Sequence, residues 1–371
     1  MLTLVGTYPP IRCGIATFNR DLREALLREG VPSQVAVVAH PEEVALPFPQ
    51  EVVRVVARED REGYRALARL LRGPVILQHE YGLYGGKWGD YVLDLLEAQG
   101  PKLVVLHTLL QAPPPGLGEA DLRYMQGLLR AMAERAQAFV ALHPEGEGLL
   151  RALGVRIPVA HIPHGVPDLP RPPKEALKRA LGLEGAFLLF TYGLLGPGKG
   201  LEFALKVLAR VLPHNPRVRY LVAGRLHPNL ERHEGRRYLE RVREMAEALG
   251  VGEAFLLRAG YLSEEELYRL AGAADLFLLA SEEESFGQAA LEALASGVPV
   301  VATAVGGVAE VVTPEVGRLV ELGDLEALAE AALDLLESPR LPEIRRRARE
   351  WARLRFRPER ITRAYLEVYA Q

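Results

Sequence analysis

The chain has 371 residues, a length typical of two domains, and 49% of them are hydrophobic and 25% charged, as in a soluble globular protein. With 45 Lys and Arg against 48 Asp and Glu, the net charge is -3, which excludes a basic nucleic-acid-binding surface over the chain as a whole. The single cysteine, Cys13, excludes an intrachain disulfide and a zinc site built from several cysteines.

Targeting and membrane signals are not found in the sequence. No apolar run approaches the roughly 20 residues of a membrane span, and the first ten residues lack the basic flank and long apolar core of a signal peptide. We therefore expect a cytoplasmic protein. Asparagine occurs only three times, which fits a heat-adapted source.

In the first half of the chain, short apolar runs alternate with segments of helical periodicity. Strands are predicted at residues 2–7, 35–38, 52–56, 75–77, 103–106 and 139–142. Helices are predicted after the first strand and at residues 61–71, 91–99 and 122–135. Continuous Val and Leu strands that alternate with helices predict a parallel sheet covered on both faces.

A proline-rich stretch after residue 165 is typical of a linker, and the alternation then starts again. Strands are predicted at residues 187–192, 220–223, 255–258, 276–279, 298–302 and 317–320. Helices are predicted at residues 201–211, 233–249, 263–272, 287–296 and 324–337. The pattern predicts two doubly wound α/β domains, residues 1–168 and 169–354, that face each other across a cleft. Ligands bind at the carboxyl ends of the strands in such sheets.

Several polar residues follow the predicted strands of the first domain. Gly14 opens a helix after the first strand, where backbone N–H groups can approach an anion, although a tight turn needs glycine equally. The segment Gln78-His79-Glu80 and His107 follow two later strands, and such histidines exchange protons or form hydrogen bonds, unless they are structural. His161 and His164 lack a third ligand, so a metal site is not expected there.

A glycine-rich loop, GLLGPGKG, follows the first strand of the second domain at residues 193–200. It nearly matches the phosphate-binding loop of nucleoside triphosphatases, but the final Ser or Thr that would bind magnesium is missing, which disfavours that class of enzyme. Lys199 at a glycine-rich helix start still suits a phosphate, as a point charge beside backbone donors. The alternative is a helix-start turn with a solvated lysine.

Two glutamates follow the predicted strand that ends before residue 280. Glu284 lies in the loop before a helix, and Glu292 lies about one and a half turns into that helix. Both can face the cleft, and carboxylates are good acceptors from sugar hydroxyls. Acidic residues also favour a helix N-terminus by charge, which explains Glu284 but not a glutamate within an otherwise apolar helix. A second glycine turn follows the next strand at residues 303–308.

These segments together resemble the GT-B, family 4 retaining glycosyltransferases. The stretch ESFGQAALEALASG is similar to their motif of two glutamates with seven residues between them, which maps onto Glu284 and Glu292. The loop GLLGPGKG resembles their phosphate-binding loop, HIPHGV the strand that closes their first domain, and GTYPPIRCGIATF their N-terminal glycine loop.

The resemblance implies two Rossmann-like domains and a nucleotide sugar bound mainly by the second. It implies that Glu292 holds the ribose hydroxyls, that Glu284 contacts the donor sugar and that Lys199 neutralises the diphosphate. Backbone N–H groups of Phe286 and Gly287 are expected nearby.

From the first domain, the resemblance implies that Gly14 closes over the phosphates and that His107 lies near the donor sugar. It also implies that a final helix, at about residues 355–371, crosses back onto the first domain, and that neither a metal nor another cofactor is needed.

This chain departs from the family at Leu194, where the family has a phosphate-binding arginine. One charge-assisted contact of about 1.5–3 kcal/mol is then absent unless another cation replaces it. Arg225, after a predicted strand, and Arg12 are the two candidates, and the sequence does not choose between them.

The predicted function is transfer of a hexose from a nucleotide-diphosphate sugar to a hydroxyl acceptor, which is a glycan, a lipid-linked molecule or a small molecule. The alternatives are a nucleotide-sugar epimerase of the same architecture and a non-catalytic sugar-nucleotide-binding subunit. No nucleic-acid partner is expected. The predicted helix at residues 122–135 is too balanced in charge to predict binding to an anionic membrane.

Overall fold

The computed structural model describes residues 1–113, 116–168, 173–226, 230 and 235–370. The chain divides into two compact units. Unit 1 comprises Met1–Gly165 and Phe356–Gln371, and unit 2 comprises Val166–Arg355. The predicted domain boundary follows residue 168, directly before the residues 169–172 that lie outside the described part of the chain, and the predicted helix start at 233 also lies outside it.

Over its described residues, unit 1 is built on a seven-stranded parallel sheet with the order β3-β2-β1-β4-β5-β6-β7. The strands are β1 (Leu2–Gly6), β2 (Ser33–Ala39), β3 (Val52–Ala57), β4 (Val75–His79), β5 (Lys102–Leu106), β6 (Ala138–Ala141) and β7 (Val159–His161). β4 is two residues longer than predicted, because Gln78 and His79 pair with β5 although neither belongs to the apolar run.

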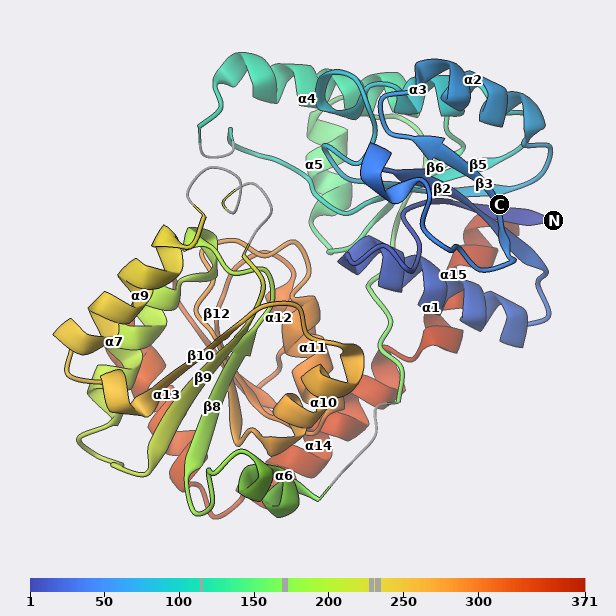
Figure 1. Cartoon of the computed structure of the whole chain (residues 1–371). Coiled ribbons are helices and arrows are strands. Elements are labelled where there is room, and N and C mark those ends of the chain that lie inside the picture. The colour runs from blue at the N-terminus through green and yellow to red at the C-terminus, as the bar shows by residue number, and fades with distance from the viewer. Residues whose placement is uncertain (114–115, 169–172, 227–229, 231–234, 371) are drawn as a thin grey trace. The chain divides into compact units, whose positions relative to one another are not determined.

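Helices cover both faces of this sheet, as the continuous apolar strands predict. Those of unit 1 are α1 (Gly14–Arg28), α2 (Arg61–Leu70), α3 (Val92–Leu95), α4 (Glu119–Ala133), α5 (Gly146–Ala152) and α15 (Pro358–Ala370). α2, α3 and α4 lie on one face, while α1 and α15 lie together on the other (Figure 1). α3 is shorter than the predicted helix, since it ends at Leu95 and the Ala98 N–H then donates to the Leu95 carbonyl in a turn, at 3.1 Å.

The last helix, α15, packs against α1 within unit 1. Arg363 donates two hydrogen bonds to Glu29, at 2.8 and 2.9 Å, and Arg28 pairs with Glu359 at 3.0 Å. The chain therefore contributes to this unit from both its beginning and its end.

Unit 2 contains a parallel sheet of six described strands, in the order β10-β9-β8-β11-β12-β13. They are β8 (Phe187–Tyr192), β9 (Val218–Gly224), β10 (Phe255–Ala259), β11 (Leu276–Leu279), β12 (Val300–Thr303) and β13 (Gly317–Val320). β8, β11 and β13 have the predicted bounds, and the other three differ at their ends.

The longer helices of unit 2 pack in two groups around this sheet (Figure 1). One group is α7 (Leu201–Val211), α9 (Arg237–Ala248) and α13 (Leu325–Glu337). The other is α6 (Lys174–Ala180), α10 (Glu264–Ala273), α11 (Gln288–Ala295) and α14 (Leu341–Arg355). The short α12 (Val308–Val311) contacts α11.

A buried ion cluster joins α6 to the sheet of unit 2. The Asp275 carboxylate, 2% exposed, accepts from Lys174, from Lys178 at 2.6 Å and from the Leu188 backbone N–H at 2.7 Å. Asp275 therefore has a structural role, in agreement with its position at the start of a strand.

The direction of winding reverses between β1 and β4 in unit 1 and between β8 and β11 in unit 2. The connections leave the sheet on opposite sides at such a point, which creates a crevice at the carboxyl ends of the two strands. The residues that follow these four strands are therefore the candidates for a ligand site.

Within the described ranges, none of the helices combines the length and apolar character needed to cross a membrane.

Candidate functional site

The glycine-rich loop after β8 is fixed in position by the segment that follows β11. Gly200 has a φ of 62°, and a Cβ atom at this residue would lie 1.8 Å from the backbone oxygen of Ala280. The Glu282 backbone N–H donates to the Gly198 carbonyl at 3.0 Å. Only glycine permits this approach, which brings the loop of Lys199 against the loop of Glu284.

Lys199 and Glu284 meet at the reversal point of unit 2. The Lys199 Nζ lies 2.5 Å from Glu284 Oε1, and the Ser281 hydroxyl donates to the same oxygen at 2.8 Å. The two charged side chains are 22% and 12% exposed, respectively. The structure thus brings together the two residues for which the sequence predicts diphosphate and sugar contacts.

The backbone around Glu284 is also held from the next strand. Gly306 has a φ of 51°, and a Cβ atom there would lie 1.6 Å from the Glu284 carbonyl oxygen. The Thr303 hydroxyl donates to the Ser281 carbonyl at 2.5 Å. The glycine turn after β12 therefore supports the Glu284 loop, a role beyond turn geometry.

α11 begins at Gln288, one residue later than predicted, because Gly287 has a φ of 90° and caps the helix. Phe286 is buried just before it. Glu292, half-buried, accepts from the Gln288 side chain at 3.0 Å, one helical turn earlier. Leu291 and neighbouring apolar residues are fully buried, so the helix anchors Glu292 by its apolar side.

Leu194 is 43% exposed in the loop after β8, whereas Arg225 follows the neighbouring strand β9. The Leu195 N–H donates to the Arg225 carbonyl at 2.7 Å, and the Gly193 N–H donates to the Ala223 carbonyl at 3.2 Å. The Arg225 Nε is buried and has no hydrogen-bond partner among the described residues. The backbone of Arg225 thus lies directly beside the loop that contains Leu194.

In unit 1, His107 follows β5, and its ring lies beside those of Phe18 and His164, with centroids 5.4 and 5.5 Å away. Its Nε2 lies 2.8 Å from the Gln78 Oε1. An amide oxygen only accepts, so His107 donates from Nε2 and its Nδ1 is an acceptor. Burial lowers the pKa of His107 well below its usual range, with smaller contributions from His164 and His79, so the ring is neutral.

His79 does not join His107 in a site. It is the last residue of β4, its side chain is buried, and neither ring nitrogen has a partner among the described residues. Burial lowers its pKa to about 4. His79 is a core residue, because alternate strand residues point to opposite faces and His79 follows Gln78, whose side chain contacts His107.

Glu80 accepts from the Thr108 hydroxyl at 2.6 Å and from the Tyr81 N–H at 2.9 Å. Burial raises its pKa to about 7. The contact between Glu80 and Thr108, like that between Gln78 and His107, joins the segments at the carboxyl ends of β4 and β5.

Gly14 is the first residue of α1, and Cys13 caps the helix. The Cys13 Sγ accepts from the Ala16 N–H at 3.4 Å and lies 3.0 Å from the Thr7 hydroxyl. A Cβ atom at Gly14 would meet nothing within 4 Å. The packing within unit 1 therefore does not require glycine at this position.

Sequence reasoning missed the support residues of the site. Ser281 lies three residues before Glu284, and Gln288 lies four residues before Glu292, a spacing that places them on the same face of a turn or helix. That spacing is the only signal the sequence offers.

Among the described residues, no group of three or more His, Cys, Asp or Glu is arranged to hold a metal ion.

The fold of the chain is similar to that of solved structures. The Anabaena protein HepE, whose structure was solved with UDP-glucose, superimposes with a TM-score of 0.80 at 19% identity, covering 100% of this chain and 99% of that one. The chain has the GT-B fold, with two parallel-sheet α/β units.

Residues 173–355 of this chain match the family described as glycosyl transferases group 1. The D-inositol 3-phosphate glycosyltransferase of Acidothermus cellulolyticus is 32% identical over 286 residues, 72% of this chain and 61% of that protein. The lipopolysaccharide core biosynthesis mannosyltransferase LpsB of Rhizobium meliloti is 32% identical over 223 residues, covering 57% and 61%. The chain thus spans less than two thirds of the length of the curated relatives it matches.

Proposed function

We propose that the protein is a nucleotide-sugar-dependent glycosyltransferase of family 4. It transfers a hexose from a nucleoside-diphosphate sugar to a hydroxyl acceptor, with retention of anomeric configuration and without a metal. The names of the relatives support the transferase class, and a structural neighbour was solved with UDP-glucose. We place the reaction in the cytoplasm.

The contact between Lys199 and Glu284 is the observation on which this proposal depends. An ammonium group has three N–H donors, so Lys199 donates to Glu284 and has donors left for phosphate oxygens. Negative charge develops on the leaving nucleoside diphosphate as the glycosidic bond breaks, and a fixed cation at that position stabilises it. Glu284 accepts hydrogen bonds from hydroxyls of the transferred sugar.

The other donor contacts follow from the same edge of unit 2. Glu292 accepts hydrogen bonds from the ribose hydroxyls, and backbone N–H groups near Phe286 and Gly287 add donors at the start of α11. Arg225 takes the place of the arginine that the family has at Leu194, because its backbone pairs with that loop and its buried Nε has no hydrogen-bond partner among the described residues. Arg12, by contrast, lies exposed before α1 in unit 1.

Unit 1 contributes His107 and Gly14 in this proposal. His107 is neutral and offers Nδ1 as an acceptor, which suits a sugar hydroxyl rather than a phosphate. Gln78 orients the ring through Nε2. Gly14 permits the donor phosphates to approach the start of α1.

The first experiment measures nucleoside diphosphate release from UDP-, GDP-, ADP- and dTDP-sugars, with and without simple glycosides. Lys199→Ala and Glu284→Ala are each expected to lower transfer tenfold or more. Lys206→Ala, an exposed lysine of α7, and Glu283→Ala, an exposed neighbour in the same loop, are the matched controls. Near-normal rates in both site variants would refute the proposal.

Two other outcomes would assign a different function. An epimeric sugar that forms without an acceptor would indicate a nucleotide-sugar epimerase. Tight donor binding with no turnover on any acceptor would indicate a non-catalytic binding subunit, for which the exposed Leu194 is the specific observation. Loss of donor binding in Glu292→Ala, with folding intact, tests the ribose contact in either case.

A further inference from the structure

A cluster of aromatic and charged side chains lies outside the proposed donor site, where the β4–α3 loop meets the start of α4. We call it the aromatic patch, and its members are Lys87, Trp88, Asp90, Asp121 and Tyr124. In a parallel sheet, the loops after strands and the N-termini of the crossover helices lie at the carboxyl edge. The patch therefore belongs to the ligand-binding edge of unit 1.

The patch is held together by three specific contacts. The Trp88 indole N–H donates to Asp121 Oδ1 at 3.1 Å, and the Tyr124 hydroxyl donates to Asp90 Oδ2 at 2.6 Å. The Lys87 Nζ lies 4.4 Å from the centroid of the Tyr124 ring. Trp88 and Tyr124 are half-buried and Lys87 is exposed, so all three residues keep part of their surface in solvent.

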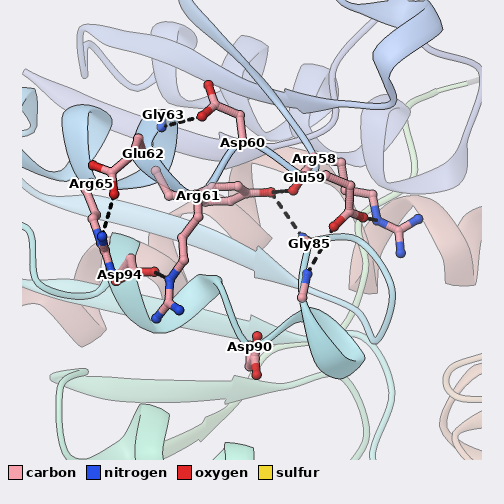
Figure 2. A network of polar contacts seen from close by, with 12 residues as sticks. Arg58, Glu59, Asp60, Arg61, Glu62, Gly63, Arg65, Gly85, Asp90 and Asp94 are labelled. Carbon is pink, nitrogen blue, oxygen red and sulfur yellow. Dashed lines mark hydrogen bonds and ion pairs between the residues drawn. The ribbon is translucent and has the colours of Figure 1, made fainter.

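The loop that carries Trp88 is pinned to the segment before α2. The Gly85 N–H donates to the Tyr64 hydroxyl at 3.2 Å, and that hydroxyl donates to the Arg58 carbonyl at 2.8 Å. A Cβ atom at Gly85 would lie 2.0 Å from the same carbonyl oxygen. Figure 2 shows Gly85 beside this segment, with Asp90 further along the loop. The patch is thus presented on a tightly packed loop.

Trp88 has a left-handed backbone, with φ 54° and ψ 26°. Its neighbours Gly86 and Gly89 also have positive φ, of 81° and 90°, but they are glycines. A bulky residue in this conformation is an outlier that the surrounding structure must enforce. At this position the indole reaches Asp121 on α4, where a glycine would contribute no side chain.

We propose that the aromatic patch binds a pyranose ring, so that the acceptor of the reaction is itself a saccharide or glycoside. Sugar rings have apolar C–H faces that stack on aromatic rings, while carboxylates and ammonium groups bind their hydroxyls. The role as acceptor site rests on the proposed glycosyltransferase function, but the binding of a saccharide does not. The two carboxylates disfavour an anionic lipid surface as the occupant.

Binding is tested in the full chain with Trp351→Phe, which leaves Trp88 as the single tryptophan. Titration with methyl α-D-glucopyranoside and with methyl α-D-mannopyranoside is expected to change Trp88 emission saturably for at least one of them. Glycerol, which has hydroxyls but no ring face, should not do so. The matched control is the Trp88→Phe chain, in which the remaining Trp351 of unit 2 should not respond.

Two variants distinguish stacking from a general effect. Tyr124→Leu is expected to weaken glycoside binding roughly three- to tenfold, whereas Lys206→Ala should not change it. Absence of a saturable response to either glycoside overturns the proposal. A response to phosphatidylglycerol vesicles in place of the glycosides also overturns it, in favour of a membrane surface.

Nucleoside diphosphate release from the donor into water, measured in the same variants, separates this proposal from the proposed function. Tyr124→Leu should leave donor hydrolysis unchanged and raise the KM of the bound glycoside as acceptor. Donor turnover without glycoside binding refutes the saccharide site alone. Glycoside binding without any donor turnover refutes the transferase function and leaves the site.

Discussion

Glu80 makes the stability of unit 1 depend on pH in a direction that can be worked out from the structure. Its carboxyl group accepts from Thr108 and from the Tyr81 N–H, but burial outweighs these bonds and raises its pKa from 4.5 to about 7. Since the folded state holds this proton more tightly than the unfolded state, unfolding becomes easier as the pH rises. The free energy of unfolding therefore falls between about pH 4.5 and pH 7, as Glu80 loses its proton.

The size of the effect follows from the two pKa values. A change from 4.5 to about 7 corresponds to roughly 3 kcal/mol of unfolding free energy between the two ends of this range. Glu80→Gln retains an oxygen that accepts from the Tyr81 N–H but cannot ionise. The difference in stability between the variant and the parent should therefore grow by roughly 3 kcal/mol, in favour of the variant, as the pH rises.

The assay is urea unfolding followed by Trp88 emission in a Trp351→Phe parent, because the remaining tryptophan then reports on unit 1. His79 and His164, each with a pKa lowered to about 4 by burial, add a slope of the opposite sign between about pH 4 and 6.5. Both proteins share that slope, so it cancels in the difference.

A difference between Glu80→Gln and its parent that stays constant from pH 4 to pH 8 would refute the reasoning. A difference that grows as the pH falls would show that hydrogen bonding, rather than burial, dominates the pKa of Glu80. Thr108→Val serves as a control, since it removes one bond to Glu80 and leaves its burial almost intact.

Three further predictions concern single residues. Gly200→Ala should destabilise unit 2 by about 3 kcal/mol or more, because its Cβ would collide with the Ala280 carbonyl, and urea unfolding that shows a loss below about 1 kcal/mol would contradict this. Gly14→Ala should leave the melting temperature unchanged, since its Cβ meets nothing, while donor-dependent nucleoside diphosphate release falls; unchanged release would remove Gly14 from the donor site. Asp275→Asn should cost about 3–5 kcal/mol because it leaves Lys178 buried without a counter-charge, and full stability in calorimetry would argue that the lysine reaches water.

Much of the fold could be predicted because period and composition are local properties. Continuous apolar runs identified nearly all of the described strands, and three strands of unit 2 were predicted with their observed bounds. Ends were predicted less well where the strand continued into polar residues, as β4 does through Gln78 and His79. Hydrogen bonds to β5, rather than side-chain polarity, decide where that strand ends.

The candidate site could be predicted in part. The loops that carry Lys199 and Glu284 follow from strand–helix boundaries and from the resemblance of their motifs. Their partners did not follow, because Ser281 and Gln288 are common surface residue types whose role depends on the direction of their side chains. The assignment of His79 to the core likewise required the pleat of β4.

The sequence by itself determined the alternation of strands and helices and the residue types that end each strand, because both depend on neighbours along the chain. Only the tertiary structure decided that β8 pairs with β11, across 83 residues of sequence between Tyr192 and Leu276. That pairing places Lys199 2.5 Å from Glu284 and pairs the cation of one loop with the carboxylate of the other. Strand order results from long-range packing and hydrogen bonding, which no local pattern encodes.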